Sequence, residues 1–318
     1  MRRLNVRQGD ETGAVAVIVA LLAVVLLGFA AISIDIGANY VEKRQLQNGA
    51  DAAALALAQD TLCKSTTGAA TAANSWVKSN VNDGNARGTA VVDTVSRKVT
   101  ATASAVGVDG QPGRQNLFAP AIGVDRSQIS ATASAGCGYP LAGTAELPLT
   151  FHKCHFVAPG VKILVQYNTT APRCNGVSGN VAPGNFGWLR GSNGGCAALI
   201  STSLYATPGD TGNNLPSACK PEIERLRGAV ALLPIYDVAG GTGSGGWFHI
   251  IGFAAFKIEG YRFSGNPEYN WQNDIHGDLS CSGSCRGVIG RYVETVSLES
   301  EFTMGGQDFG VTVVNLLD

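Results

Sequence analysis

The sequence predicts an α+β protein, with one N-terminal transmembrane helix that extends into a small α/β sandwich, followed by a mostly β, disulfide-containing domain. An uncharged apolar run covers residues 14–34, alternating strand patterns dominate after residue 140, and the chain contains 8 cysteines. Its 318 residues leave room for two domains besides the anchor. The predicted division is a cytoplasmic tail (1–13), a transmembrane helix (14–34), an extended helix with a small α/β domain (35–140) and a mostly β extracytoplasmic domain (141–318).

The apolar run over residues 14–34 reads AVAVIVALLAVVLLGFAAISI. A helix of about 20 residues crosses the hydrocarbon core of a bilayer. A cleaved signal peptide has a shorter apolar region of about 7–15 residues before a small-residue cleavage site. The longer run, without a clear cleavage site, favours a retained anchor. Arg2, Arg3 and Arg7 precede it, so the positive-inside rule places the N-terminus in the cytoplasm and the body outside.

The charge of the chain does not indicate a polyanionic partner such as nucleic acid. The formal net charge is -1 and charged residues make up 15% of the sequence. Such a balanced surface produces no global field that attracts nucleic acid. We therefore expect no nucleic-acid partner. We also expect no cofactor, because the one cofactor-like motif, described below, lacks its structural context, and the oligomeric state stays open.

An even number of cysteines in an exported chain predicts disulfides. Sequence neighbours are the favoured pairs, 154 with 174, 196 with 219 and 281 with 285, which leaves 63 and 137 to close a long loop. Spacing alone leaves other pairings open. The disulfide candidates are Cys63, Cys137, Cys154, Cys174, Cys196, Cys219, Cys281 and Cys285.

A specific pattern follows the apolar run. An Asp-x-Gly step comes first, then an aromatic and a basic pair, and then the stretch QLQNGADAAALA. The residues that define the pattern are Asp35, Gly37, Gln45, Leu46, Gln47, Asn48, Asp51, Ala53 and Leu55. Gly49 departs from it, since Ala is expected there. The pattern resembles the N-terminal region of TadG-like and TadE-like proteins of Flp (Tad) pilus assembly.

The resemblance implies a membrane-anchored, non-enzymatic component of pilus assembly or surface adhesion, with other pilus-assembly proteins and the cytoplasmic membrane as partners. A pilin has a similar layout, but prepilin processing in those families uses a Glu four or five positions after a Gly. Val17 and Ile18 stand there after Gly13, which favours an assembly component over a fibre subunit. The alternative function is an anchored cell-envelope module that binds glycan or peptide and is unrelated to pili.

Residues 14–60 lack proline and are rich in helix formers, so they predict one helix of about 46 residues and about 69 Å, twice the membrane core. Its second half must leave the bilayer. An Ala-rich face there allows close approach either of the chain's own sheet or of a neighbouring helix. This face contains Ala50, Ala53, Ala54, Leu57 and Ala58.

The body predicts short helices over 66–82, 115–124 and 216–230, the second of them reading QNLFAPAIGV. Strand patterns cover 89–94, 97–106 and 128–137 before the predicted boundary, and 147–151, 161–167, 229–238, 247–263 and 289–298 after it. The segments over residues 183–189, 232–238, 249–263 and 285–294 also resemble C-terminal regions of TadG-related proteins.

Several short motifs suggest chemistry but lack its context. A G-x-G-x-x-G over 241–246 precedes a strand pattern, whereas a dinucleotide site needs a helix there. Ser75 and Lys78 form an S-x-x-K without the K-T-G partner of penicillin-binding enzymes. We expect neither motif to carry catalysis.

Metal ligation is equally disfavoured. In a strand, His152 and Cys154 would lie on one face and His155 on the other, so the three would not bind one metal ion together. Cys281 and Cys285, next to His276, have no second pair of ligands near in sequence. The aromatic side chains of the β domain, among them Phe186, Trp188, Trp247, Phe248, Tyr261 and Trp271, either pack in the core or line a binding surface.

Overall fold

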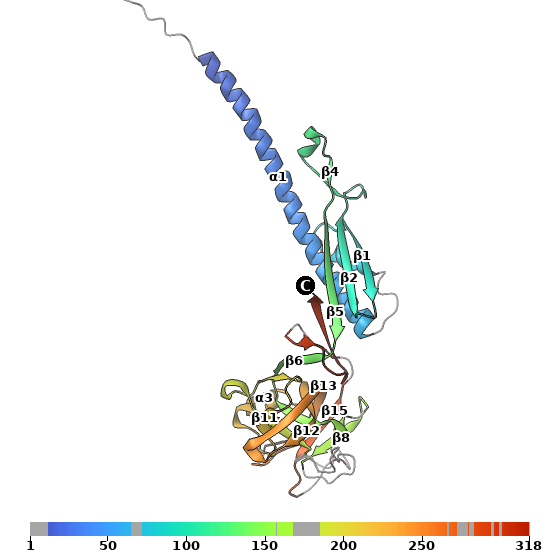
Figure 1. Cartoon of the computed structure of the whole chain (residues 1–318), viewed down its shortest axis with the longest axis vertical. Helices are drawn as coiled ribbons and strands as arrows, with labels where there is room; N and C mark the ends of the chain where they lie inside the picture. The colour runs from blue at the N-terminus through green and yellow to red at the C-terminus, as the bar shows by residue number, and fades with distance from the viewer. Residues whose placement is uncertain are drawn as a thin grey trace, which may run out of the picture.

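The computed structural model describes residues 12–64, 72–156, 158–167, 185–265, 267–271, 279, 283–293, 296–298 and 301–317. One long helix projects from a β-rich body, and the body has two parts that follow each other along the long axis (Figure 1). The α+β class and the long N-terminal helix agree with the prediction.

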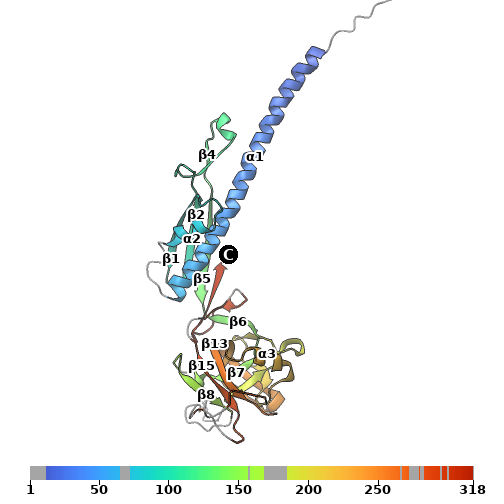
Figure 2. The same cartoon turned by 180° about the vertical axis from the view of Figure 1, so that it is seen from behind.

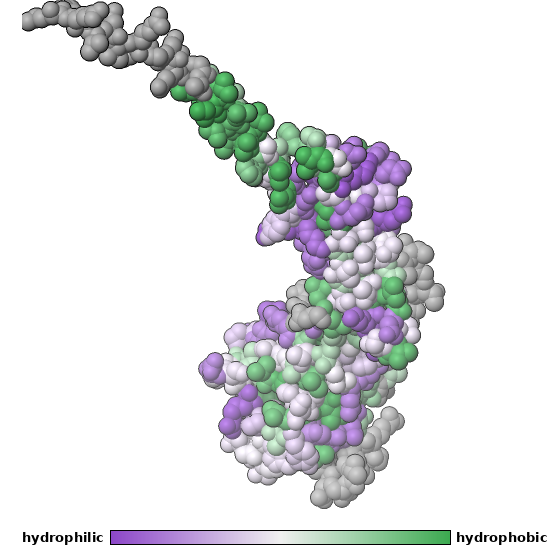
Figure 3. Space-filling model, turned by 45° about the horizontal axis from the view of Figure 1, so that its top comes forward, coloured by the Kyte–Doolittle hydropathy of each residue, from purple (hydrophilic) through white to green (hydrophobic). Residues whose placement is uncertain are grey.

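Helix α1 (Thr12–Leu57) has 46 residues and continues into a short π-helical segment, η1 (Ala58–Cys63). Its side chains are exposed from Val15 to Ala30. Figure 3 shows this half as a hydrophobic rod that stands clear of the more polar body. The helix is long and apolar enough to cross a membrane, and none of its most apolar stretch is buried. Only the second half of α1 packs against the protein.

The first part of the body is a five-stranded sheet with the order β1-β2-β5-β18-β16. Its strands are β1 (Ala86–Asp93), β2 (Lys98–Ala105), β5 (Ser130–Gly138), β16 (Val296–Leu298) and β18 (Val311–Leu317). All neighbours are antiparallel except β16 and β18. Helix α2 (Ala73–Ser79) lies beside the end of α1 (Figure 2), and both helices pack on this sheet.

The side-chain alternation of the strands explains why one face of this sheet carries the helices. In β2, Val99, Ala101, Ala103 and Ala105 are buried, whereas the residues between them are partly exposed. The small side chains allow the backbone of α1 to approach the sheet closely. The resulting core also contains Leu46, Ala50, Ala53, Ala54, Leu57 and Ala58 of α1 and η1. The Ala-rich face of the helix therefore packs in the chain's own core.

A two-stranded ribbon extends from this sheet alongside α1. It consists of β3 (Arg114–Gln115), the 3₁₀ turn η3 (Ala119–Ile122) and β4 (Arg126–Ser127). The helix predicted over 115–124 is wrong, because only this one turn forms. Gly123 ends the turn at φ 83°, a left-handed conformation that suits glycine.

The second part of the body is mostly β. A three-stranded sheet, β10-β6-β17, contains β6 (Pro140–Ala145), β10 (Ala198–Ser201) and β17 (Thr303–Met304). An eight-stranded sheet contains β7 (Leu149–His152), β8 (Lys162–Gln166), β9 (Phe186–Leu189), β11 (Thr207–Asp210), β12 (Val230–Gly240), β13 (Gly246–Arg262), β14 (Glu268–Tyr269) and β15 (Gly287–Tyr292). The connections include helix α3 (Lys220–Arg225) and the 3₁₀ turns η4 (Lys153–His155), η5 (Ser192–Gly194), η6 (Ser217–Cys219) and η7 (Gly243–Gly245).

Strand β13 organises the eight-stranded sheet, because its 17 residues pair with β11, β12, β14 and β15 at different points. Strand β11 pairs with both β9 and β13, so β11, β9, β7, β12 and β13 form a closed ring. Aromatic side chains fill this region, with Phe151 in edge-to-face contact with both Phe186 and Phe256.

The end of the chain returns to the first sheet. Strand β18 pairs with β5, and the predicted strand over 289–298 divides into β15 of the eight-stranded sheet and β16 of the five-stranded sheet. Val313 of β18 also belongs to a core cluster with Phe253 and Phe302. The domain boundary near residue 140 stays a prediction, and the C-terminal strand contributes to the sheet that precedes it.

Candidate functional site

The residues that carry the predicted family pattern lie on α1, and Asp35 makes the most specific contact among them. It is the first residue after the apolar run and is only 4% exposed. Its carboxylate accepts hydrogen bonds from the backbone N–H groups of Leu117 (2.8 Å), Phe118 (2.9 Å) and Ala119 (2.7 Å). These groups lie just before and at the start of the turn η3, so Asp35 caps that turn from another element of the chain. The contact fixes the end of the β3–β4 ribbon to the helix.

The surroundings of Asp35 favour its ionised form. Burial raises the pKa of this carboxyl, but the three backbone hydrogen bonds, together with the positive charge of Arg114, lower the pKa by more. The net pKa lies below the ordinary value of an aspartate. A carboxylate that accepts three N–H donors is held as an anion at neutral pH.

Asp35 begins a row of polar contacts at four-residue spacing, the spacing that places side chains on one helical face. One turn further, Asn39 accepts from Arg114 Nη1 (3.1 Å) and donates to Ser127 Oγ (3.0 Å). Lys43 then donates to the carbonyl oxygen of Ser130. The four residues Asp35, Asn39, Lys43 and Gln47 form what we call the polar row of α1.

Gln47 ends the polar row. Its Nε2 lies 2.8 Å from Asp51 Oδ1 and 3.5 Å from the carbonyl oxygen of Thr132. The row thus follows the chain from the η3 turn through β4 into β5. The family pattern included Asp35, Gln47 and Asp51, and Lys43 through its basic pair, but it missed Asn39. The four-residue spacing after Asp35 is the signal that could have identified Asn39.

The other residues of the pattern lie in different surroundings. Leu46 and Ala53 are completely buried against the sheet. Gln45, Asp51 and Leu55 are partly buried, whereas Gly37 and Asn48 are exposed. The pattern therefore combines core residues, contacts to the ribbon and exposed positions.

The exposed positions share one face of α1. Ile36 is 63% exposed, Tyr40 58% and Val41 54%. Arg44 donates to the Tyr40 hydroxyl (2.6 Å), and its guanidinium lies 4.6 Å from the Tyr40 ring centroid. These side chains, with Gly37 and Asn48, form what we call the outer stripe of α1. It combines apolar, aromatic and cationic groups just outside the predicted membrane span.

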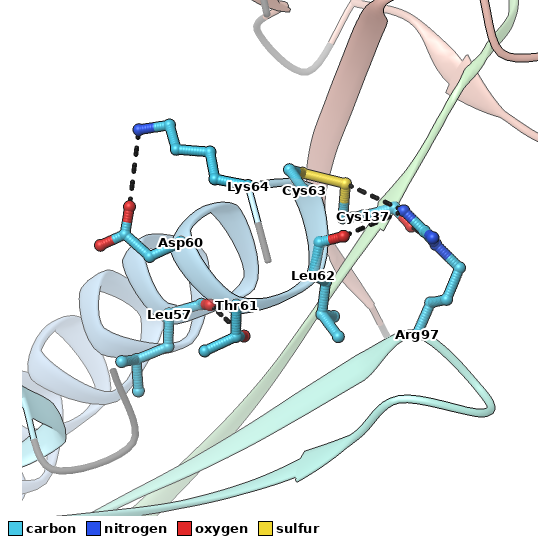
Figure 4. Close-up of a disulfide and its surroundings, with 8 residues drawn as sticks. All are labelled: Leu57, Asp60, Thr61, Leu62, Cys63, Lys64, Arg97 and Cys137. Carbon is cyan, nitrogen blue, oxygen red and sulfur yellow. Dashed lines mark hydrogen bonds and ion pairs between the residues drawn. A yellow bond between two sulfur atoms is a disulfide. The ribbon is translucent and has the colours of Figure 1, made fainter. Parts of the chain in front are cut away.

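The far end of the helix is fixed to the sheet by a disulfide and by Arg97 (Figure 4). Cys63 is bonded to Cys137 of β5. Arg97 donates through Nε to the carbonyl oxygen of Cys137 (2.9 Å) and through Nη2 to that of Leu62 (3.2 Å). The arginine thereby satisfies one of the last carbonyl groups of the helix.

A second disulfide joins Cys196 to Cys219. Both bonds are pairs that the sequence favoured. Cys154 and Cys285 are also disulfide-bonded. Cys174 and Cys281 lie outside the described residues, so the pairs 154 with 174 and 281 with 285 stay predictions.

The glycine motif and the histidine cluster, which suggested other chemistry, lie in ordinary parts of the β structure. Gly241 to Gly245 connect the antiparallel strands β12 and β13, and Gly246 begins β13, so a strand and not a helix follows the motif. His152 is 3% exposed, with its Nδ1 accepting from the N–H of Cys154 (3.2 Å) and its Nε2 3.0 Å from the carbonyl oxygen of Asp237. Within the described ranges, no three His, Cys, Asp or Glu side chains are placed to hold a metal ion.

The aromatic residues of the β domain pack in its interior. Five of the six candidates are buried, including Trp188, which is 1% exposed and contacts Phe263 edge to face at 5.4 Å. Trp247 is the partly exposed exception, and its ring lies 5.7 Å from that of Tyr205. The proposed aromatic binding surface is therefore not formed by these six residues.

Comparison with known proteins locates the resemblance on the same helix. Neither the curated proteins nor the solved structures contain a match to the chain. A protein-family model does match the chain, and the matched segment runs along α1 from the start of its apolar half to η1. It therefore contains the polar row, the outer stripe and every residue of the predicted pattern. Residues 13–60 match the Tad family, described as Flp pilus-assembly TadE/G-like, which is the family that the sequence pattern resembles.

Proposed function

We propose that the chain is a membrane-anchored, non-enzymatic component of Tad/Flp pilus assembly or surface adhesion that acts through protein contacts outside the cytoplasm. The match of residues 13–60 to the Tad family carries the proposal. The structure supports it with a helix whose first half is apolar and exposed and whose second half is built into a folded body. The N-terminal arginines favour an N-terminus in the cytoplasm and a body on the other side.

The outer stripe of α1 is the surface that we assign to partner contacts. Three of its side chains are more than half exposed although they are aromatic or branched apolar residues. Tyr and Arg are the residue types that contribute most to protein interfaces. The stripe also begins where the predicted span ends, within reach of other proteins anchored in the same membrane.

A complementation experiment tests the proposal. Deletion of the gene is expected to abolish pilus assembly and surface adherence, and the full chain to restore both. The double variant Tyr40→Ala, Arg44→Ala should insert in the membrane at normal level but restore assembly poorly. The control Val91→Ala, at a 71% exposed position on β1, should restore it fully. Unchanged piliation and adherence after deletion would reject the proposal.

The alternative, an envelope module that binds a peptide or glycan, has one supporting observation. A cavity of about 580 Å³ in the β domain is lined by apolar side chains, including Leu147, Leu226 and Phe302, with Glu146 and Glu301 also in its wall. Such a site suits a partly apolar ligand with cationic groups. Binding of cationic peptides by the chain, lost in the variant Leu232→Arg, would favour this function over the first.

A further inference from the structure

The tip of the β3–β4 ribbon exposes an unusual number of apolar side chains. Residues 117–124 read LFAPAIGV and contain no charge. Leu117 is 66% exposed, Phe118 47%, Ile122 70% and Val124 46%. Contiguous exposed apolar groups on a short turn mark a contact surface. Figure 3 shows a small hydrophobic area next to the projecting helix, in the part of the molecule where this tip lies.

The position of the tip suggests what it contacts. Asp35 holds the N–H groups of residues 117–119, and Asp35 is the first residue after the apolar run of α1. The turn η3 also packs directly against α1. In Figures 1 and 2 the ribbon runs alongside α1 toward the exposed half of that helix. If the run over 14–34 spans the bilayer, the tip is held at the level of the membrane surface.

The backbone of the tip suits an apolar environment. Besides the three N–H groups bound by Asp35, those of Ala121, Gly123 and Val124 donate to carbonyl oxygens within the tip. Residue 120 is a proline and has no N–H group. Asn116 closes the base through its Nδ2, 3.1 Å from the carbonyl oxygen of Val124. Few backbone donors are left that would have to lose water on entering lipid, which is the main barrier to placing an irregular segment there.

The charges of the ribbon begin at its base. Arg114, Asp125 and Arg126 flank the tip, and Arg114 donates to Asn39, one helical turn after Asp35. The polar part of α1 begins at the same point. The ribbon and the helix therefore change from apolar to polar at the same level, as expected for two elements that meet one bilayer surface.

We propose that residues 117–124 insert into the outer interface of the membrane that α1 spans, as a second and shallower contact with lipid. The inference rests on the membrane anchor of the proposed function and adds to it a lipid-facing tip. Asp35 has the role of a positioning residue that ties this tip to the end of the span.

Site-specific photocrosslinking in lipid nanodiscs tests the inference. The full chain, in discs of phosphatidylcholine and phosphatidylglycerol with an alkyne on the acyl chain, receives benzoylphenylalanine at one position at a time. Positions 118 and 122 report on the tip, and position 26, in the apolar run, reports on the span. Position 95 is the control, because Val95 is 94% exposed in the β1–β2 turn, and that turn lies beside the far end of the helix.

Lipid adducts at 118 and 122 that exceed those at 95 by at least about tenfold are expected, since burial of one large apolar side chain favours the buried state by at least that factor. Adducts at 26 but none above control at 118 and 122 would overturn the tip inference and leave the anchor intact. Crosslinks from 118 and 122 mainly to protein would also overturn it. Absence of lipid adducts at 26 would reject the anchor itself.

Discussion

Removal of the Cys63–Cys137 disulfide should loosen the first sheet and leave the β domain intact. The bond joins residues 74 positions apart, near the end of η1 and in the central strand β5. A closed loop of that length stabilises the folded state by about 4 kcal/mol in the chain-entropy description. The variant Cys63→Ala, Cys137→Ala keeps the two hydrogen bonds from Arg97 to the backbone, so besides the covalent link it removes only the weak contact of Arg97 with the Cys137 sulfur (3.6 Å) among the contacts of that arginine.

Amide hydrogen exchange of the full chain in micelles measures the effect region by region. Exchange in β2 and β5 should become about 10³-fold faster, because a loss of about 4 kcal/mol raises the population of the opened sheet by that factor. Exchange in β12 and β13 should stay unchanged. The matched control Cys196→Ala, Cys219→Ala removes a link of 23 residues, worth about 3 kcal/mol, and should affect the β domain instead. An acceleration in β2 and β5 below about tenfold, equivalent to about 1.4 kcal/mol, would refute the reasoning.

Three further predictions concern packing and pH. Leu46→Ala removes a completely buried side chain between α1 and the sheet and should lower the free energy of unfolding by about 2–5 kcal/mol. The control Val41→Ala, at an exposed position, should change it by less than about 0.5 kcal/mol. Urea denaturation measures both variants. Gly88→Ala places a Cβ 2.5 Å from the carbonyl oxygen of Ala73 and should lower the free energy of unfolding by about 1–3 kcal/mol. The control Thr89→Ala, on the exposed side of β1, should not lower it in this way. An equal loss of stability in both variants would contradict the packing of α2 on β1. Burial lowers the pKa of His155 to about 4 and also lowers that of His152. Because the unfolded chain then binds more protons, stability should be present above pH 6.5 and fall between pH 6.5 and 4, by about 2 kcal/mol at pH 5 for His155. His155→Gln should reduce this pH dependence. A denaturation midpoint of the unmodified chain that is equal at pH 7 and pH 5 would contradict the predicted loss of stability.

The sequence predicts well those elements that depend on local patterns. The helix predicted over 14–60 is observed as Thr12–Leu57 with its continuation to Cys63, because helix propensity and the apolar run act over neighbouring residues. The strands predicted over 97–106 and 247–263 correspond to β2 and β13. The helix predicted over 115–124 does not form, because the backbone N–H groups there bind Asp35, more than 80 residues earlier. A prediction from neighbouring residues does not include so distant a partner.

Strand pairing between distant segments also lies beyond a local reading. Residues 311–317 read VTVVNLL, an ordinary strand pattern that contains nothing to identify its partner. The structure pairs them with β5, whose residues precede them by more than 170 positions. For the candidate site, the family pattern identified Asp35 and Leu46, but only the fold shows that one contacts the ribbon and the other the core.

The contacts of α1 fix its second half to the body at three levels. The polar row fixes the helix to the ribbon near residue 35, the Ala-rich face fixes it to the sheet, and the disulfide fixes its end to β5. Strand β18 then links this sheet to the β domain, because it pairs with β5 while Val313 packs with Phe253 of β13. A helix held at three levels cannot tilt without carrying the sheet with it. If a partner binds the outer stripe, as proposed above, a pull or tilt that it applies would reach the β domain through these packed elements.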